Sequence, residues 1–355
     1  MKGYQFEDTQ GTFHLKKAEN ISYLYFPIAG EAGLKSSFTP NLGGDAKIDQ
    51  NTFLLEPVSA ENLVNNRNSR NFWCNVKGIG SWSLTGHSAE ELSKKFTEMQ
   101  DDSEVTAGFM WQKTTRESKK YQLRGEILSF IPVDKNVEIM LVTITNTGRM
   151  AQTVTPTAAI PLYGRSADNI RDHRHVTSLL HRIETTDTGV LVTPTLSFDE
   201  RGHQVNHMTY YCVGWSGNGE KPVDFYPTAE DFVGEGGNFE RPYAIVKNAE
   251  GVKAGTKIEG LEAVGGLHFS EITLEPEEEC SYLIFTGITE DIQEIRNLSK
   301  TYTTREKVLE ELEKTKAYWQ EKVNVAYHTG DSDFNQFMHW VSFQPILRRI
   351  YGCSF

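Results

Sequence analysis

The chain has 355 residues, which is enough for two domains of ordinary size or for one large β domain with an appendage. Its hydrophobic content of 38%, with 11% aromatic residues, excludes a disordered chain. With 36 basic and 48 acidic residues the net charge is −12, so the chain repels the phosphate backbone of DNA and RNA, and we expect no nucleic-acid partner.

The beginning of the chain does not have the pattern of a targeting segment. Met1–Asn20 lacks the apolar core of a secretory signal. No later segment has the roughly 18 consecutive apolar residues of a membrane span, so we expect no membrane partner. The cysteines are far apart, which argues against a disulfide framework or a cysteine-based zinc site: Cys74, Cys212, Cys280 and Cys353. We therefore expect a reducing, cytoplasmic location.

Residues 3–286 have the pattern of an antiparallel β domain, with short apolar runs separated by turn residues. Val137–Asn146 is rich in β-branched residues and ends in a turn signal. Val190–Phe198 reads as a strand that contains Pro194, which favours a sheet edge or a bulge. So many strands in one segment predict a single large antiparallel sandwich.

The pattern becomes helical after Thr289. A helix is predicted over Thr303–Val323, where Thr303 and Glu306 have the spacing of a capping box. Its apolar residues lie on one face, and charged residues fill the rest: Val308, Leu312, Trp319 and Val323. We interpret this segment as a linker helix with a polar outer side.

A second helix is predicted from about Asp331. Apolar residues at i, i+3, i+4 and i+7 begin the pattern, and further ones widen the apolar surface until it nearly encircles the helix: Phe334, Phe337, Met338, Trp340, Val341, Phe343, Ile346 and Leu347. Such a helix is normally buried in a larger helical body. We therefore expect the complete protein to continue beyond Phe355.

Common catalytic motifs are absent from the sequence. There is no P-loop, no G-x-S-x-G and no H-E-x-x-H. Histidine pairs occur at 173 and 175 and at 203 and 207, but the arginines beside the first pair would repel a cation, so we expect no metal site. The adjacent carboxylates Asp199 and Glu200 are typical of a turn rather than of a glycosidase acid and base.

One segment concentrates charge and hydrogen-bonding groups. Pro161–Ile183, PLYGRSADNIRDHRHVTSLLHRI, contains four arginines, three histidines and two aspartates. In an acidic chain, such a segment can attract an anionic or polyhydroxyl ligand. Arginine forks bind carboxylate or phosphate, and Asp and His bind sugar hydroxyls. The alternative is a salt-bridged loop that packs on a neighbouring domain, and spacing alone leaves both interpretations open.

Four stretches resemble the N-terminal region of the 1,2-β-oligoglucan phosphorylases, within the cellobiose and cellodextrin phosphorylase family: Phe53–Leu63 (FLLEPVSAENL), Ser69–Cys74 (SRNFWC), Pro161–Ile183 and Leu196–Asn206 (LSFDERGHQVN). The likeness extends over essentially the whole chain. It implies a mainly β fold, with a large antiparallel β-supersandwich of the galactose-mutarotase type at 1–288. A helical linker at 289–328 and the first helix of a truncated (α/α)6 barrel at 329–355 would follow.

The resemblance also implies a reaction. Family members cleave β-glucosides reversibly, and inorganic phosphate, the co-substrate, inverts the anomeric carbon to give α-glucose 1-phosphate. An aspartate in the barrel is the general acid, and neither a metal nor an organic cofactor is required. We expect that barrel beyond Phe355, so we assign no catalytic residue to this chain and expect it to be inactive alone. The implied partners are a β-glucan oligosaccharide, phosphate and a second copy in a homodimer.

Site residues are implied by the same resemblance. In related cellobiose phosphorylases, an N-terminal-domain loop contributes a Gln-Arg pair to a sugar subsite within a homodimer. His173 and Arg174 occupy the matching positions here, and the second choices nearby are Arg165, Asp168, Asn169, Arg171 and Asp172. Two other interpretations remain: a freestanding carbohydrate-binding β-sandwich without catalysis, and a mutarotase-type enzyme by analogy of fold. The apolar helix after Asp331 favours the phosphorylase over the freestanding module.

Overall fold

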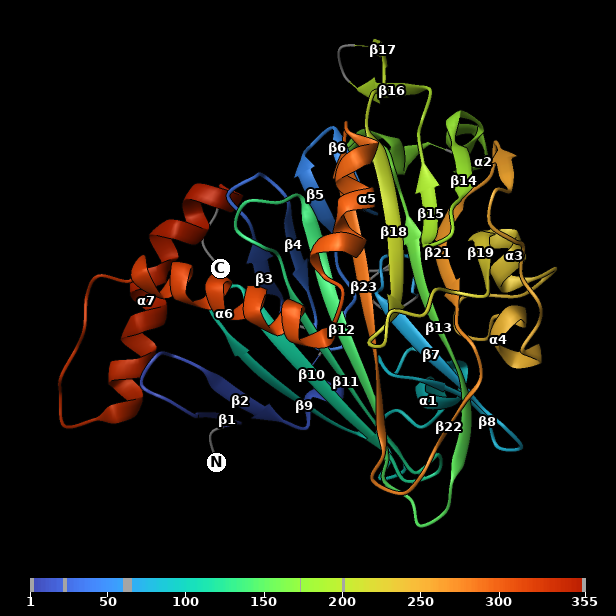
Figure 1. Ribbon diagram of the computed structural model, residues 1–355. Coiled ribbons are helices and arrows are strands. Elements are labelled where there is room, and N and C mark those ends of the chain that lie inside the picture. Colours follow the sequence, from blue (N-terminus) through green and yellow to red (C-terminus); the bar gives the residue numbers. More distant parts are fainter. Residues whose placement is uncertain (1–2, 22–23, 60–65, 173, 200–201, 353–355) are drawn as a thin grey trace.

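The computed structural model describes residues 3–21, 24–59, 66–172, 174–199 and 202–352, and antiparallel strands dominate it (Figure 1). The largest sheet has eleven strands in the order β1 (Tyr4–Phe6), β2 (Phe13–Lys16), β9 (Asp102–Gly108), β10 (Trp111–Ser118), β11 (Leu123–Phe130), β12 (Val137–Asn146), β23 (Glu279–Thr289), β18 (Thr209–Ser216), β15 (Gly189–Val192), β14 (Arg182–Thr185) and β20 (Lys257–Glu259). This sheet forms the main layer of the sandwich.

Smaller sheets pack against this layer. One has the order β19 (Asp224–Thr228), β21 (Ala263–His268), β13 (Gln152–Leu162), β7 (Asn71–Val76) and β8 (Gly80–Ser83), with β22 (Ile272–Leu274) paired to β13. Another contains β3 (Phe26–Ala29), β4 (Lys35–Phe38), β5 (Ala46–Asp49) and β6 (Thr52–Leu55). A hairpin of β16 (Leu196–Asp199) and β17 (Gly202–Val205) projects from the top of the sandwich in Figure 1.

The helices are few and mostly peripheral. The three long ones are α5 (Ile292–Thr301), α6 (Arg305–Glu321) and α7 (Ser332–Tyr351). Short turns of helix occupy the connections: η1 (Ala18–Asn20), α1 (Ala89–Ser93), η3 (Ala167–Arg171), α2 (Arg174–Thr177), η4 (Ser178–Leu180), α3 (Ala229–Val233) and α4 (Tyr243–Lys247). None of the helices in the described ranges is long and apolar enough to cross a membrane.

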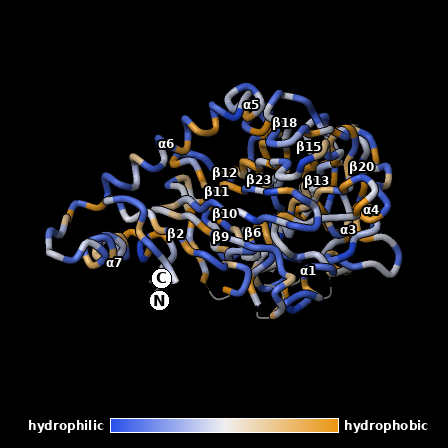
Figure 2. Tube along the Cα trace, turned by 90° about the horizontal axis from the view of Figure 1, so that it is seen from below, coloured by the Kyte–Doolittle hydropathy of each residue, from blue (hydrophilic) through white to orange (hydrophobic). Residues whose placement is uncertain are grey.

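The core explains why β12 is buried along its whole length. Successive side chains of a strand point to opposite faces. On one face, Met140 and Val142 join the main core between the sheets. On the other, Ile139 and Leu141 pack beneath α5 and α6 with Leu312. Seen from below, α6 and α7 extend from one side of the sandwich (Figure 2). The predicted sandwich, the strand Val137–Asn146 and the apolar face of α6 are confirmed.

Two local predictions are wrong. Val190–Phe198 is not one strand, because β15 ends at Val192 and β16 begins at Leu196, with Pro194 between them. Proline has no N–H to donate to a sheet, so the ladder ends before it. The predicted capping box is also displaced by one residue, since Thr304 and not Thr303 is the N-cap of α6, and its side chain makes no capping bond to the backbone.

Helix α7 is docked along one face only. Phe343 and Leu347 are each 1% exposed and pack with Phe109 and Trp319. The Trp340 indole donates a hydrogen bond of 2.7 Å to the Gly11 carbonyl. The opposite face carries three apolar side chains, Phe334, Phe337 and Val341, with exposures of 45%, 54% and 42%. The predicted all-round apolar surface is therefore half covered by the sandwich itself.

We expect the double variant Phe337→Glu with Val341→Lys to reduce self-association of the chain. Contiguous exposed apolar side chains promote association, and Glu followed by Lys four residues later stabilises a helix surface. The unfolding free energy should change by less than about 0.5 kcal/mol, because neither side chain lies in the docked face. Light scattering at increasing concentration measures the effect, and an unchanged scattering curve would contradict it.

Candidate functional site

The charged segment begins where β13 ends, and its first part is fixed to β6. The Phe53 amide donates to the Arg165 carbonyl at 3.0 Å, and the Gly164 amide donates to the Phe53 carbonyl at 3.1 Å. Gly164 has a φ of 61°, a left-handed conformation that glycine adopts without steric cost. The turn that directs the chain into the loop therefore depends on this glycine.

Arg165 is the buried anchor of the loop. Its side chain is 5% exposed, and Nη2 donates to Glu262 Oε1 at 2.8 Å. Its guanidinium carbon lies 5.1 Å from the centre of the Tyr163 ring. Glu262 precedes β21, which pairs with β13 from Leu162↔Ala263 onward. Since burial and pairing hold Arg165 in place, its position suits support of the loop more than direct contact with a ligand.

The next predicted residues form a small hydrogen-bonded cap on the loop. Asn169 is 5% exposed, accepts from Ser166 Oγ at 3.2 Å and donates to Asp172 Oδ2 at 3.0 Å. Asp168 is half-buried, whereas Arg171 and Asp172 are exposed. The structure thus brings Asn169 and Asp172 together and leaves charged groups at the surface of the loop.

The two first-choice residues are placed only in part. His173 lies outside the described residues. Arg174 is the first residue of α2, a helix of four residues. Asp172, the residue that precedes them in the chain, is exposed. Their assignment to a sugar subsite stays a prediction.

His181 closes the segment as a fully buried residue. Its Nδ1 lies 3.2 Å from the Leu261 carbonyl, so the neutral ring donates there. Burial, together with the positive charge of Arg165, lowers the pKa of His181 to about 3. A histidine that remains neutral at every physiological pH is structural, and we do not assign it proton transfer.

We expect acidification to destabilise the protein through His181. The unfolded chain binds a proton at this ring near its ordinary pKa, whereas the folded chain does so only near 3, so stability falls as pH drops below about 6.5. The loss is about 2 kcal/mol at pH 5. Urea unfolding of His181→Gln should therefore show a shallower decline between pH 7 and 5. An equal decline for His181→Gln and the unaltered chain would contradict this assignment.

A small cleft beside the loop gathers groups that sequence reasoning missed. Glu56, Arg67, Tyr163, Phe239 and Glu262 line a volume of about 30 Å³. The Arg67 guanidinium lies 5.8 Å from the Phe239 ring centre. These residues come from distant segments, and among them only Tyr163 lies in the charged segment singled out from the sequence. Carboxylates, a cation and aromatic rings together are suited to sugar hydroxyls and ring faces.

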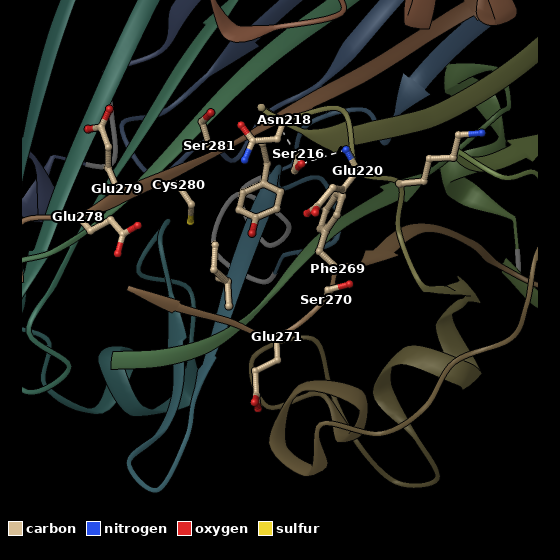
Figure 3. A pocket seen from close by; sticks show the side chains of 14 residues that line it. Ser216, Asn218, Glu220, Phe269, Ser270, Glu271, Glu278, Glu279, Cys280 and Ser281 are labelled. Atoms are coloured by element: carbon tan, nitrogen blue, oxygen red, sulfur yellow. Dashed lines mark hydrogen bonds between the residues drawn. The ribbon is translucent and has the colours of Figure 1, made fainter. Parts of the chain in front are cut away.

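A larger pocket at another end of the sandwich has different chemistry (Figure 3). It has a volume of about 340 Å³ and is lined by four carboxylates, together with Cys280 and Tyr282: Glu220, Glu271, Glu278 and Glu279. Burial raises the pKa of the Cys280 thiol to about 12, so it is a poor nucleophile. In the described part of the chain, no group of three or more His, Cys, Asp or Glu side chains is placed to hold a metal ion.

Comparison with known families gives a match over most of the chain. The family described as glycosyl hydrolase 94, supersandwich domain, matches residues 55–305. The curated proteins contain no match. The family match over residues 55–305 includes β7 to β23 and the whole charged loop.

Solved structures share the fold at low identity. A bacterial glucoamylase complexed with acarbose superposes with a TM-score of 0.53 at 8% identity, over 90% of this chain and 40% of its own. A putative kojibiose phosphorylase from the human microbiome has a TM-score of 0.49 at 9% identity, over 97% of this chain and 42% of its own. The chain therefore spans about two fifths of these structures. At such identities the likeness to the glucoamylase concerns the fold alone, and it agrees with the β-supersandwich.

Proposed function

Because this chain belongs to the family of glycosyl hydrolase 94 supersandwich domains, we propose that it is the N-terminal portion of an inverting glycoside phosphorylase. In the proposed reaction, inorganic phosphate attacks the anomeric carbon of a β-glucan oligosaccharide, with β-1,2 linkages as the preferred substrate. The glycosidic bond breaks, α-glucose 1-phosphate forms, and the shortened oligosaccharide leaves with the proton of a general acid. The family match over residues 55–305 is the observation that carries the proposal.

The proposed division of labour assigns chemistry and recognition to different parts of the complete protein. A general acid must lie within hydrogen-bond reach of the leaving oxygen, and we assign that aspartate to an (α/α)6 barrel. Residues 1–288 would form the recognition domain, 289–328 the linker and 329–355 the first part of the barrel. Phosphate is a co-substrate here, and the proposal includes neither a metal nor an organic cofactor.

Recognition of the sugar would depend on the charged loop. In the proposed homodimer the loop enters the active site, where Arg174 and His173 bind sugar hydroxyls. Arg165, buried and paired to Glu262, supports this role because it holds the base of the loop against β21. The bond between Asn169 and Asp172 supports it further, since it orders the backbone immediately before the two binding residues.

We expect the purified chain to release no glucose 1-phosphate from β-1,2-gluco-oligosaccharides in the presence of phosphate, because the general acid is assigned to the barrel. The complete protein should release it, and proton NMR should show the α anomer as the first product. Glucose 1-phosphate formed by the chain alone would contradict the division of labour. Failure of the complete protein on β-1,2-, β-1,3- and β-1,4-linked oligosaccharides would contradict the proposed function.

A further inference from the structure

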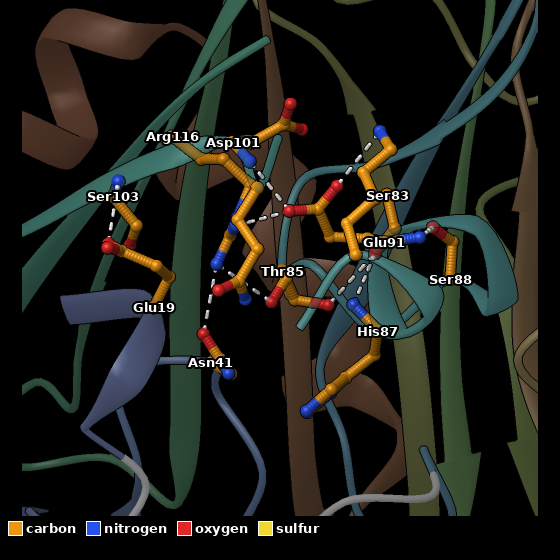
Figure 4. A network of polar contacts seen from close by, with 12 residues as sticks. Glu19, Asn41, Ser83, Thr85, His87, Ser88, Glu91, Asp101, Ser103 and Arg116 are labelled. Atoms are coloured by element: carbon orange, nitrogen blue, oxygen red, sulfur yellow. Dashed lines mark hydrogen bonds and ion pairs between the residues drawn. The ribbon is translucent and has the colours of Figure 1, made fainter. Parts of the chain in front are cut away.

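A further polar hollow, apart from the cleft and the pocket described above, lies between β10, α1 and the loop that follows β4 (Figure 4). We call it the Arg116 hollow, and the side chains and backbone that line it are Glu19, Thr39, Asn41, Gly86, His87, Glu91, Leu92, Lys95, Gln100 and Arg116. Its volume is about 20 Å³. Since one water molecule needs a volume of roughly 10 to 15 Å³, the hollow has room for one hydroxyl-sized group.

Arg116 is the charged group inside the hollow, and it is 2% exposed. Its Nη2 donates to Asn41 Oδ1 at 3.0 Å and to the Thr85 carbonyl at 3.4 Å. Nη1 lies 3.9 Å from Glu91 Oε1, at the limit of an ion pair. Within the described residues, Nε has no hydrogen-bond partner. A buried donor without a partner carries a desolvation cost, which an oxygen atom placed in the hollow would remove.

The backbone allows the Arg116 guanidinium to pack directly against the turn at Gly86. Gly86 has a φ of 75°, and a Cβ atom there would lie 2.6 Å from the guanidinium carbon of Arg116. Only glycine therefore permits this close approach.

The charges around the hollow favour a neutral ligand. Arg116 and Lys95 would repel a cation, and Glu19 and Glu91 would repel an anion. The Glu91 and Glu19 carboxylates already accept from the amides of Asp101 and Ser103, at 2.7 and 3.2 Å. The hollow therefore contains both donors and acceptors, and a sugar hydroxyl, which is both donor and acceptor, can pair with either.

An exposed aromatic residue, Phe96, follows Lys95 in the chain, and the Lys95 Nζ lies 5.6 Å from the centre of its ring. Phe96 is 86% exposed, and its amide donates to Gln100 Oε1 at 3.1 Å. Its φ of 68° is unfavourable for a bulky residue. Lys95 and Gln100, on either side of the bend, both line the hollow. Met99, 73% exposed, is a second exposed apolar residue of the same bend.

We propose that the Arg116 hollow is a carbohydrate subsite, in which a glucose ring lies on Phe96 and one of its hydroxyl groups enters the hollow and accepts a hydrogen bond from Arg116 Nε. The choice of glucose as the sugar rests on the proposed function, whereas the subsite itself rests on the geometry of these residues. The aromatic ring supplies a face for the C–H groups of the sugar, and the hollow selects a hydroxyl of suitable orientation.

The test follows the Arg116 Nε–H resonance in the ¹⁵N-labelled chain, with Arg116→Lys identifying the signal. The chain is titrated with sophorose (β-1,2), cellobiose (β-1,4) and inorganic phosphate, each up to about 50 mM, where a millimolar site is largely saturated. We expect at least one disaccharide to shift this resonance and phosphate to leave it unchanged. If Arg116→Lys does not fold, the signal is assigned by triple-resonance spectra of the unaltered chain.

Phe96→Ala should weaken the disaccharide titration by about 3- to 10-fold, the usual range for one stacking contact. Phe334→Ala, the same substitution at an exposed position on α7, is the control and should leave it unchanged. No shift with either sugar, a shift with phosphate alone, or equal binding by Phe96→Ala would each overturn the inference. Phosphorolysis by the complete protein without the shift would overturn only this inference, and a shift without phosphorolysis would overturn only the proposed function.

Discussion

Glu138→Ala is expected to lower the free energy of unfolding by about 3 to 5 kcal/mol, because it leaves a buried arginine without its counter-charge. Arg70 and Glu138 are both 0% exposed. Arg70 donates to Glu138 through Nε, and through Nη2 at 3.1 Å. The same carboxylate accepts from Ser36 Oγ. Arg70 Nη1 donates to the Gly44 carbonyl at 2.9 Å, so one pair ties β12 to two neighbouring segments.

Denaturant unfolding of matched variants measures how much of this loss arises because the ion pair is buried. Glu271→Ala is the control, because Glu271 pairs with Lys77 at 3.2 Å in an exposed position and should contribute about 0 to 1 kcal/mol. Replacing both partners, with Arg70→Met and Glu138→Leu, should recover part of the loss, since no unpaired charge remains. A Glu138→Ala variant as stable as Glu271→Ala would show that the pair is not desolvated.

Arg174→Ala in the complete protein is expected to reduce kcat/KM for the oligosaccharide by about 10- to 100-fold. A charge-assisted hydrogen bond from an arginine to a sugar oxygen is worth roughly 1.5 to 3 kcal/mol, and about 1.4 kcal/mol corresponds to a factor of ten. An arginine that only pairs at the surface would contribute about 0 to 1 kcal/mol to stability and nothing to kinetics. Phosphorolysis rates and melting temperature on the same variant separate the two roles.

Arg182→Ala is the matched control on the same segment. Arg182 is half-exposed and donates through Nη1 to the carbonyls of Leu179 and His181 at 3.0 and 2.9 Å. Its removal should leave kcat/KM unchanged. If Arg174→Ala lowers the melting temperature by several degrees and leaves the kinetics unaltered, the loop has a structural role and its proposed sugar contact is wrong.

Local sequence patterns were sufficient to predict the strands and helices in which buried residues recur at a regular spacing along the chain. The β-branched residues of Val137–Asn146 predicted β12 with the bounds that the structure shows, because a strand in the middle of a sheet presents apolar side chains to both layers. The spacing of Val308, Leu312 and Trp319 likewise predicted the buried face of α6. Pro194 was predicted to mark a sheet edge or a bulge, but its missing N–H separates β15 from β16 instead.

Sheet order determined the partners of the charged residues. Arg165 was predicted from the loop sequence, but its partner Glu262 is 97 residues away and meets it only because β13 and β21 are neighbours. The sequence supplied arginine, histidine and aspartate at close spacing, and it could not separate the buried Arg165 from the exposed Arg171. Burial of a charge depends on which distant carboxylate lies opposite it, and that is a non-local property.

The β pattern, the helical C-terminal part and the charged loop could be predicted from the sequence, because each depends on residues close together in the chain. Which polar groups converge depends on the tertiary fold. The Arg116 hollow joins η1, the loop after β4, α1 and β10, from Glu19 to Arg116. No short-range periodicity of the sequence predicts this arrangement, because the pairing of distant strands brings these segments together.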